Sequence, residues 1–277
     1  MKKWILSGIG YLLIVVIGYM IYSTLFQDDV AQTEDSHGEH EVVNENETDS
    51  HGHGDHQDEN PTGVSEVKVD LIVEGDEMRI ALTNLKGEPV TNLEINHEKL
   101  LHLIVVDEHL DQYYHLHPEE VGTGQFMVKH SFKEGAYKAF VDIKPSELSY
   151  TVSPIEFTIG NIEESHAHDH LEVDTEFQKT INDVTVSLNI TSFKVQEDVT
   201  LTFSFPEGTN LEPYLGAMGH VVILDEEADN YIHVHPVSEE DTIFATSFPK
   251  AGIYKVWGEF QINGQVYTYP FVIEISE

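Results

Sequence analysis

The sequence predicts an all-β protein in which two tandem immunoglobulin-like or cupredoxin-like β-sandwiches follow an N-terminal transmembrane helix. Three observations predict this fold: an uncharged apolar run at the N-terminus, an internal duplication of the remaining chain, and short β-branched segments separated by turn residues. After the N-terminal run, no segment has a convincing helical period. The 277 residues suffice for one anchor and two domains of roughly 100 residues each.

The membrane anchor is expected over residues 1–27. From Trp4 to Phe26 the chain runs 23 positions without a charged residue. A helix rises about 1.5 Å per residue, so this run can span a hydrocarbon core of about 30 Å. It is too long for the apolar region of a cleaved signal peptide, which is usually about 7–15 residues. Lys2 and Lys3 precede it, which predicts a single-pass cell-membrane protein with a cytoplasmic N-terminus and extracytoplasmic C-terminal domains.

Two acidic, histidine-bearing linkers are expected at residues 28–63 and 161–171. The first linker contains no Lys or Arg and little apolar patterning, so it should be disordered, because it cannot bury enough surface to offset its ordering entropy. Both linkers contain short histidine tracts among carboxylates, which are a compositional signal of metal binding. A solvated spacer with the same composition remains the alternative interpretation.

The composition excludes several classes of partner and site. The chain has 14 Lys and Arg residues against 50 Asp and Glu residues, which gives a formal net charge of −36. Such a chain lacks the basic face that nucleic acid binding requires, and it attracts cations instead. No cysteine is present. Disulfides, thiolate zinc sites and the cysteine ligand of a blue-copper centre are therefore excluded.

Residues 64–160 and 172–277 are expected to be two copies of one domain. The segment Thr91–Glu94 recurs as Thr209–Glu212 at an offset of 118. At that offset, 12 of the 28 positions from residue 91 to residue 118 are identical without a gap. Chance does not give this similarity, so the sequence predicts an internal repeat.

Most of each copy is expected to form β-strands. Strands are predicted at Val67–Val73, Met78–Leu82 and Leu101–Val106 in the first copy, and at Val184–Ile190 and Val199–Phe205 in the second. These segments are rich in β-branched residues, and turn sequences such as Asn263-Gly264 follow at short intervals. The pattern indicates a sandwich of about seven strands in each copy and not a parallel α/β sheet.

Each copy carries one histidine, then twelve residues, then the sequence His-x-His-Pro. On a strand, His115 and His117 share one face about 6.5–7 Å apart. A hairpin centred between His109 and Leu110 would place His102 opposite His117, whereas a shift of one residue would move His102 to the other face. The sequence therefore predicts a three-histidine metal site in each copy, formed by His102, His115 and His117 and by His220, His233 and His235.

The expected cofactor is a copper or zinc ion, because three imidazoles suit either metal and leave an open coordination position. Met218 lies two residues before His220, and its soft thioether is a candidate ligand that would favour Cu(I). Leu100 stands at the equivalent position of the first copy. His97 and His130 have no histidine counterparts in the second copy. They are candidates for an extra ligand, although a surface position is the stronger expectation.

The stretch from Gly219 to Pro236, with Phe248 to Trp257 after it, resembles a domain of uncharacterised exported or membrane-anchored bacterial proteins. That family is often associated with copper or other heavy-metal handling and is distantly similar to YtkA-like and cupredoxin-like sandwiches. The resemblance covers most of residues 172–277 and, more weakly, residues 64–160. The resemblance implies a β-sandwich fold and an association with metal handling, but no activity. Electron transfer is not implied, because the blue-copper cysteine is missing.

Two functions remain open from the sequence. The first is an extracytoplasmic copper- or zinc-binding protein that acts as a buffer, sensor or metallochaperone. The alternative is a cell-surface immunoglobulin-like protein that binds a cell-envelope partner, with histidines that are structural. An enzyme is not expected, because no persuasive general base accompanies the histidines. Tyr113 and Tyr231 are expected to pack, and the acidic pairs beginning at Asp107 and Asp225 are expected to form turns.

Overall fold

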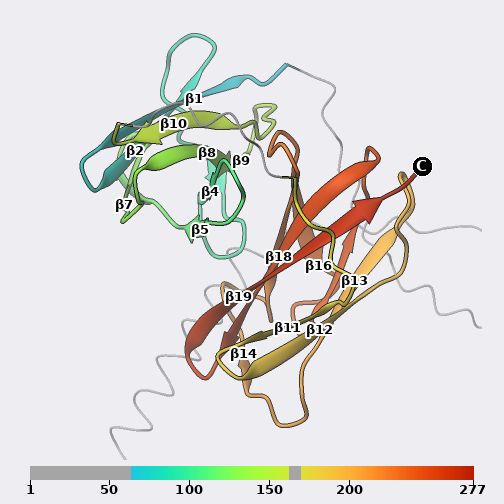
Figure 1. The fold of residues 1–277 in the computed structure, drawn as a ribbon. Coiled ribbons are helices and arrows are strands. Elements are labelled where there is room, and N and C mark those ends of the chain that lie inside the picture. Colours follow the sequence, from blue (N-terminus) through green and yellow to red (C-terminus); the bar gives the residue numbers. More distant parts are fainter. Residues whose placement is uncertain (1–63, 162–169) are drawn as a thin grey trace, which may run out of the picture. The chain divides into compact units, whose positions relative to one another are not determined.

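The computed structural model describes residues 64–161 and 170–277, and every regular element in these residues is a β-strand (Figure 1). Among these residues there is no helix with the length and apolar composition of a membrane span. The expected anchor at 1–27, the linker at 28–63 and residues 162–169 of the second linker lie outside the described part of the chain. Both β domains belong to one compact unit, residues 58–277.

The first domain is a two-layer antiparallel sandwich. Its strands are β1 (Val67–Glu74), β2 (Glu77–Asn84), β3 (Leu93–Glu94), β4 (His102–Asp107), β5 (Tyr113–Leu116), β6 (Glu119–Gly122), β7 (Gln125–Lys129), β8 (Gly135–Asp142), β9 (Lys144–Pro145) and β10 (Ile155–Ile159). One sheet has the order β1-β2-β7-β6 and the other the order β10-β8-β4-β5, while β3 pairs with β9. Side chains of both sheets form one buried core, which includes Met78, Phe126, Leu103 and Tyr137.

The second domain repeats this arrangement with its layers joined. Its strands are β11 (Gln178–Ile181), β12 (Val184–Ile190), β13 (Val199–Ser204), β14 (Leu211–Glu212), β15 (His220–Asp225), β16 (Tyr231–Pro236), β17 (Ile243–Thr246), β18 (Gly252–Ile262) and β19 (Gln265–Ile275). The sheet order is β11-β12-β13-β17-β16-β15-β18-β14, and β19 also pairs with β18. Strand β16 pairs first with β15 and then with β17, and it thereby links the two layers.

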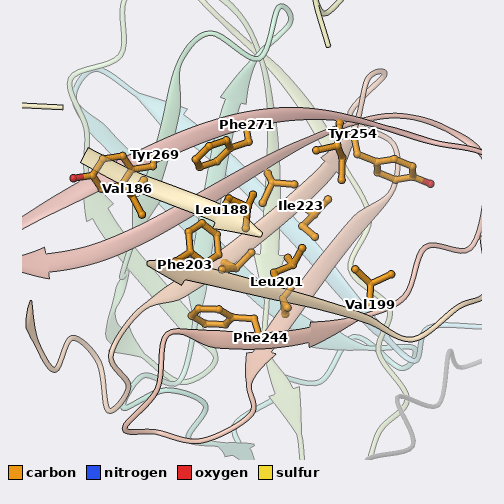
Figure 2. Close-up of a cluster of buried hydrophobic side chains, with 14 of the residues drawn as sticks. Val186, Leu188, Val199, Leu201, Phe203, Ile223, Phe244, Tyr254, Tyr269 and Phe271 are labelled. Carbon is orange, nitrogen blue, oxygen red and sulfur yellow. The ribbon is translucent and has the colours of Figure 1, made fainter. Parts of the chain in front are cut away.

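Figure 2 shows the core between the layers of the second domain. Val186 and Leu188 of β12 face Ile223 of β15 and Phe271 of β19, and all four side chains are buried. The alternating residues of β12 point outward, as the period of a half-buried strand requires. Close packing continues to the start of β15, where a Cβ atom on Gly219 would lie 2.4 Å from the ring of Phe260.

The sequence-based expectations for the strands are largely confirmed. Strands β1, β2, β4, β12 and β13 each begin within one residue of the predicted start. The expected number of about seven strands per copy was too low. The described residues contain ten strands in the first domain and nine in the second. The surplus comes mainly from short elements such as β3, β9 and β14, which have two residues each and are too short to show a periodic pattern.

Strands β4 and β15 are buried on both faces, which explains why their sequences do not alternate. Leu103 and Val105 of β4 belong to the core of the first domain. Ile104 and Val106, on the opposite face, belong to a separate cluster that includes residues of the second domain. A strand with two buried faces has a continuous apolar sequence, as the run that begins at Leu101 does.

This shared cluster forms an interface in which the two repeats use equivalent surfaces. Its buried members are Ile104, Val106, Leu110 and Phe140 from the first domain, and Val222, Leu224, Ala228 and Trp257 from the second. Each member of the first set occupies the same position in its repeat as its counterpart in the second. An interface built from the same patch on both partners is isologous, as in two-fold symmetric dimers. An approximate two-fold symmetry therefore relates the two repeats of this one chain across their interface.

Aromatic contacts across the interface also occur in equivalent pairs. Tyr113 stacks on Trp257 with ring centroids 4.9 Å apart. Tyr231, the counterpart of Tyr113, stacks on Phe140 with centroids 5.5 Å apart. The expectation that both tyrosines are packing residues is confirmed, and their packing partners lie in the other repeat.

Ion pairs cross the interface in the same equivalent fashion. Lys138 Nζ lies 2.7 Å from Asp229 Oδ1, and the equivalent Lys255 Nζ lies 4.0 Å from Asp111 Oδ1. Lys138 also donates a hydrogen bond to the backbone oxygen of Glu227 at 2.7 Å. The two ion pairs have equivalent positions but different distances. The two-fold symmetry of the interface is therefore only approximate at these exposed contacts.

Candidate metal centre

The hairpin of β4 and β5 sets the positions of the first histidine triad. Leu103 pairs with Leu116 in the antiparallel register, and continuing that register by one residue places His102 opposite His117, as predicted. The loop holds this register through Asp107, whose Oδ1 accepts a hydrogen bond of 2.7 Å from a backbone amide on the far side of the turn. The expectation that Asp107 is a turn residue is confirmed.

The three histidines of the first domain converge. One ligand-capable nitrogen from each of His102, His115 and His117 lies within 4.8 Å of the other two. The ring centroids of His115 and His117 are 4.6 Å apart, and both rings lie about equally far from His102, at 5.2 Å and 5.1 Å. His102 Nδ1 lies 2.9 Å from His115 Nε2. The structure thus brings the predicted triad together on one face of the hairpin.

Two rings of the triad are held by their outer nitrogens. His102 Nε2 lies 2.9 Å from the backbone oxygen of Asn96, and because a carbonyl only accepts, this nitrogen carries the hydrogen. His102 Nδ1 therefore offers a lone pair toward the triad. His115 Nδ1 lies 2.5 Å from Glu259 Oε2, while its Nε2 faces His102. In metal sites, a carbonyl or carboxylate on the outer nitrogen fixes the orientation of the ligating ring.

The third ring, His117, has an unsatisfied nitrogen. Its Nε2 is buried and has no hydrogen-bond partner among the described residues. Burial lowers the pKa of His117 to about 3, and the nearby imidazoles of His115 and His102 act in the same direction. The ring is therefore neutral at neutral pH, which is the form that binds metal ions. A buried polar atom without a partner costs about 1–3 kcal/mol, so a cation at this position would remove a penalty.

His220 of the second domain lies beside the first triad. Its ring centroid is 6.1 Å from that of His115 and 4.9 Å from that of His97. Its Nε2 lies 2.7 Å from the backbone oxygen of Tyr214, which mirrors the contact between His102 and Asn96. Burial is the main cause that lowers the pKa of His220 to about 2. His220 is therefore another neutral imidazole at neutral pH.

The second predicted triad is described only in part. His233 and His235 lie on β16, and the backbone of His233 pairs with Val222 in the same register as the first hairpin. The side chains of His233 and His235 lie outside the described part of the chain. Met218 lies in the bend before β15, where its backbone amide donates to the oxygen of Glu239 at 3.1 Å. A metal-ligating role for these three residues remains a prediction.

The structure places His97 next to the triad, where the residue is half-buried. His97 lies in the tight turn before β4 with a φ of 45°, and its ring makes edge contacts with His102 and His220. The contact with His220 was not predicted, because the second repeat, which supplies it, is distant in sequence. His130, in contrast, lies apart from the triad and stacks on Phe132 with centroids 4.3 Å apart.

Two buried carboxylates were not predicted. Asp142 of β8 pairs in register with His102, and Glu259 of β18 pairs in register with His220. Tyr113 donates to Glu259 Oε2 at 3.2 Å, and its counterpart Tyr231 donates to Asp142 Oδ2 at 3.1 Å. Burial raises the pKa of both tyrosines well above the usual range. The available signal was an acidic residue at equivalent positions of two strands that are mostly apolar.

Comparison with known proteins gives one family match. The family model described as Domain of unknown function (DUF8832) matches the chain twice, at residues 62–161 and 179–277, which confirms the duplication. No curated protein matches the chain. A solved structure of the adhesin FdeC from Escherichia coli is similar over 77% of this chain and 65% of that chain, with 13% identity and a TM-score of 0.23.

The likeness to FdeC is too weak to support an argument. This chain spans 65% of the length of that structure, which is just under two thirds. The similarity to YtkA-like and cupredoxin-like proteins is not confirmed by these comparisons and stays an expectation. The family match thus supports a duplicated domain and implies no activity.

Proposed function

The chain belongs to the DUF8832 family, and we propose that it binds a copper or zinc ion on the imidazoles of His102, His115 and His117. The observation that best supports this proposal is the pattern of contacts around the triad. Two rings are anchored at one nitrogen by a carbonyl or a carboxylate and turn the other nitrogen toward the common centre. The third ring has a buried nitrogen with no partner among the described residues.

The spacing of the ligand nitrogens also supports the proposal. Zinc–nitrogen bonds of about 2.0–2.1 Å place two ligand nitrogens of a tetrahedral ion about 3.3 Å apart. The three nitrogens already lie within 4.8 Å of one another, so small side-chain rotations suffice to reach that distance. Three protein ligands leave one coordination position open for water or for a group that exchanges the ion.

We further propose an extracytoplasmic buffer, sensor or metallochaperone that is anchored to the cell membrane by residues 1–27. This part of the proposal rests on the sequence: the uncharged N-terminal run, the histidine tracts of the linkers and the net charge of −36. An acidic chain raises the local concentration of cations. The tracts would collect metal ions weakly, and the triad would retain one more tightly.

A second candidate function is an interaction protein whose histidines hold the two repeats together. The observation that favours it is the contact between His115 and Glu259, which joins side chains of the two repeats directly. In that case the triad would be a structural hydrogen-bonded cluster, and the partner would be a protein of the cell envelope. Retention of metal by the purified chain distinguishes the two candidates.

The test is a titration of the full chain with Zn²⁺, Cu²⁺ and Cu⁺ in the presence of a competing chelator, which removes ions held weakly by the histidine tracts. The variant carries His115→Ala and His117→Ala, and the control carries His130→Ala, a histidine outside the triad. We expect a tightly bound equivalent in the parent and the control that is missing from the variant. If the parent and the variant retain equal amounts of each metal, the triad is not a site and the structural role is favoured.

A further inference from the structure

We infer that the second repeat completes the metal centre: Glu259 is a positioning residue for His115, and metal binding and the docking of the two repeats strengthen each other. This inference rests on the proposed function, because it concerns the same triad. The contact that carries it joins His115 Nδ1 to Glu259 Oε2 at 2.5 Å, and both side chains are buried.

The carboxylate of Glu259 is held at both of its oxygens. Oε2 accepts from the hydroxyl of Tyr113 at 3.2 Å in addition to its contact with His115. Oε1 lies 3.5 Å from Oγ1 of Thr268 on the neighbouring strand β19. A carboxylate with fixed oxygens can impose one orientation on the imidazole that it contacts, and it also raises the basicity of the opposite nitrogen.

The support for the triad comes from two repeats. The outer nitrogen of His102 is held by Asn96, which belongs to the same repeat. The outer nitrogen of His115 is held by a residue of the other repeat. The orientation of His115 that directs Nε2 toward His102 therefore depends on the interface. Without docking, Nδ1 of His115 would exchange this fixed partner for water.

The equivalent carboxylate of the first repeat differs from Glu259. Asp142 is one methylene shorter, and it accepts from Tyr231 at 3.1 Å. Asp142 and Glu259 therefore share an equivalent tyrosine donor from the other repeat but differ in the length of the side chain.

The coupling between metal and interface is reciprocal by thermodynamics. If docking raises the affinity of the triad for a cation by some factor, the bound cation raises the docking equilibrium by the same factor. Loss of the residue that holds the outer nitrogen of a ligating histidine typically lowers metal affinity about 10–100-fold. The coupling factor expected for Glu259 is of that order.

The first experiment compares the affinity of the full chain for Zn²⁺ between the parent, Glu259→Gln and Tyr113→Phe. Tyr113→Phe is the matched control, because it removes the other hydrogen bond to the same carboxylate oxygen and leaves the contact with His115. We expect a loss of about 10–100-fold for Glu259→Gln and less than about threefold for Tyr113→Phe. The visible spectrum of bound Co²⁺ should shift in Glu259→Gln only, which a general loss of stability would not produce.

The second experiment weakens the interface away from the triad. Lys138→Glu places a like charge opposite Asp229 across the interface. The control is Lys144→Glu, which reverses the charge of a lysine whose partner, Glu94, lies in the same repeat. We expect Zn²⁺ affinity to fall in Lys138→Glu relative to Lys144→Glu. Equal affinity in the two variants would overturn the coupling.

The outcomes separate this inference from the proposed function. If the parent chain and the variant without His115 and His117 have the same affinity for Zn²⁺, the proposed function fails and the inference fails with it. If the parent binds Zn²⁺ at the triad and Glu259→Gln binds it equally well, only the inference fails, and the triad is then a site of the first repeat alone.

Discussion

The two repeats differ in what they contribute to the histidine cluster. Both supply a buried histidine at the start of the central strand, His102 and His220, each anchored by a backbone carbonyl. The first repeat adds His97, where the second has Leu215. The second repeat supplies Glu259, which reaches His115 across the interface. Two copies of one fold have therefore kept a common surface while the residues around the cluster have diverged.

The apolar interface and the histidine cluster therefore differ in how closely the two repeats resemble each other. The apolar interface residues are matched position by position between the repeats. The ionisable residues that surround the histidines are matched in place but differ in type, as Asp142 and Glu259 do. Packing therefore retains the two-fold relation closely, whereas the carboxylates beside the histidines retain it in position and in their tyrosine donors but not in residue type.

Substitution of the large aromatic side chains of the interface should destabilise the protein most. Trp257→Ala and Phe140→Ala each remove a large buried side chain at equivalent positions. We expect each to lower the free energy of unfolding by about 3–5 kcal/mol, because a cavity replaces the ring. Urea denaturation followed by fluorescence and circular dichroism measures this change in the free energy of unfolding. A loss below about 1 kcal/mol for either variant would mean that this cluster is not buried in solution.

A smaller effect concerns pH and the buried histidine of the second repeat. The folded-state pKa of His220 is about 2, whereas an unfolded chain has a histidine pKa of about 6.5. Below about pH 6.5 the unfolded state therefore binds a proton that the folded state does not, and stability falls as the pH is lowered. For one such histidine the loss from about pH 7.5 to about pH 5 is roughly 2 kcal/mol.

This pH effect is measured by urea denaturation of the metal-free chain at both pH values. The His220→Gln variant should show a smaller difference between the two, because it lacks the titrating group. An unchanged difference in this variant would contradict the buried, neutral state of His220.

The hydrogen bonds that the tyrosines make across the interface should contribute equally in the two repeats. Tyr113→Phe and Tyr231→Phe each remove one hydroxyl that donates to a carboxylate of the other repeat and leave the stacked ring in place. We expect each to lower the free energy of unfolding by about 1 kcal/mol. Denaturation curves of the two variants should nearly coincide, and a difference above about 1 kcal/mol would show that the pseudo-symmetry does not extend to these bonds.

Substitution of the lysines at the rim of the interface should change the stability least. Lys138 makes two contacts of 2.7 Å across the interface, whereas Lys255 lies 4.0 Å from its partner. Ion pairs with an exposed partner contribute about 0–1 kcal/mol. We expect Lys138→Ala to lower the midpoint of urea denaturation slightly more than Lys255→Ala does, and high salt should reduce the difference. The reverse order would contradict the closer contact of Lys138.

Much of each repeat could be predicted from the sequence, because the evidence for it is local. The alternation of apolar and polar residues in β12 and β13 predicted where these strands lie. The gapless duplication indicated that the hairpins of the two repeats have the same strand register. The turn formed by Asp107 and the spacing of His102, His115 and His117 then predicted that three imidazoles share a face.

The contacts between the repeats could not be predicted in the same way. His115 and Glu259 are 144 positions apart, and no periodic pattern relates residues at that distance. The non-alternating strands β4 and β15 did carry a signal that a second face is buried, but such a sequence does not identify what covers it. Glu259 and the position of His97 therefore required the fold.

The isologous interface has a consequence for how the protein can change. In a dimer of two identical single-repeat chains, every substitution would occur on both sides of the two-fold axis at once. In this chain the two sides are encoded separately, so a mutation can alter one carboxylate or one histidine while its counterpart stays as it was. Covalent linkage of the repeats thus permits an asymmetric site at the centre of a symmetric surface.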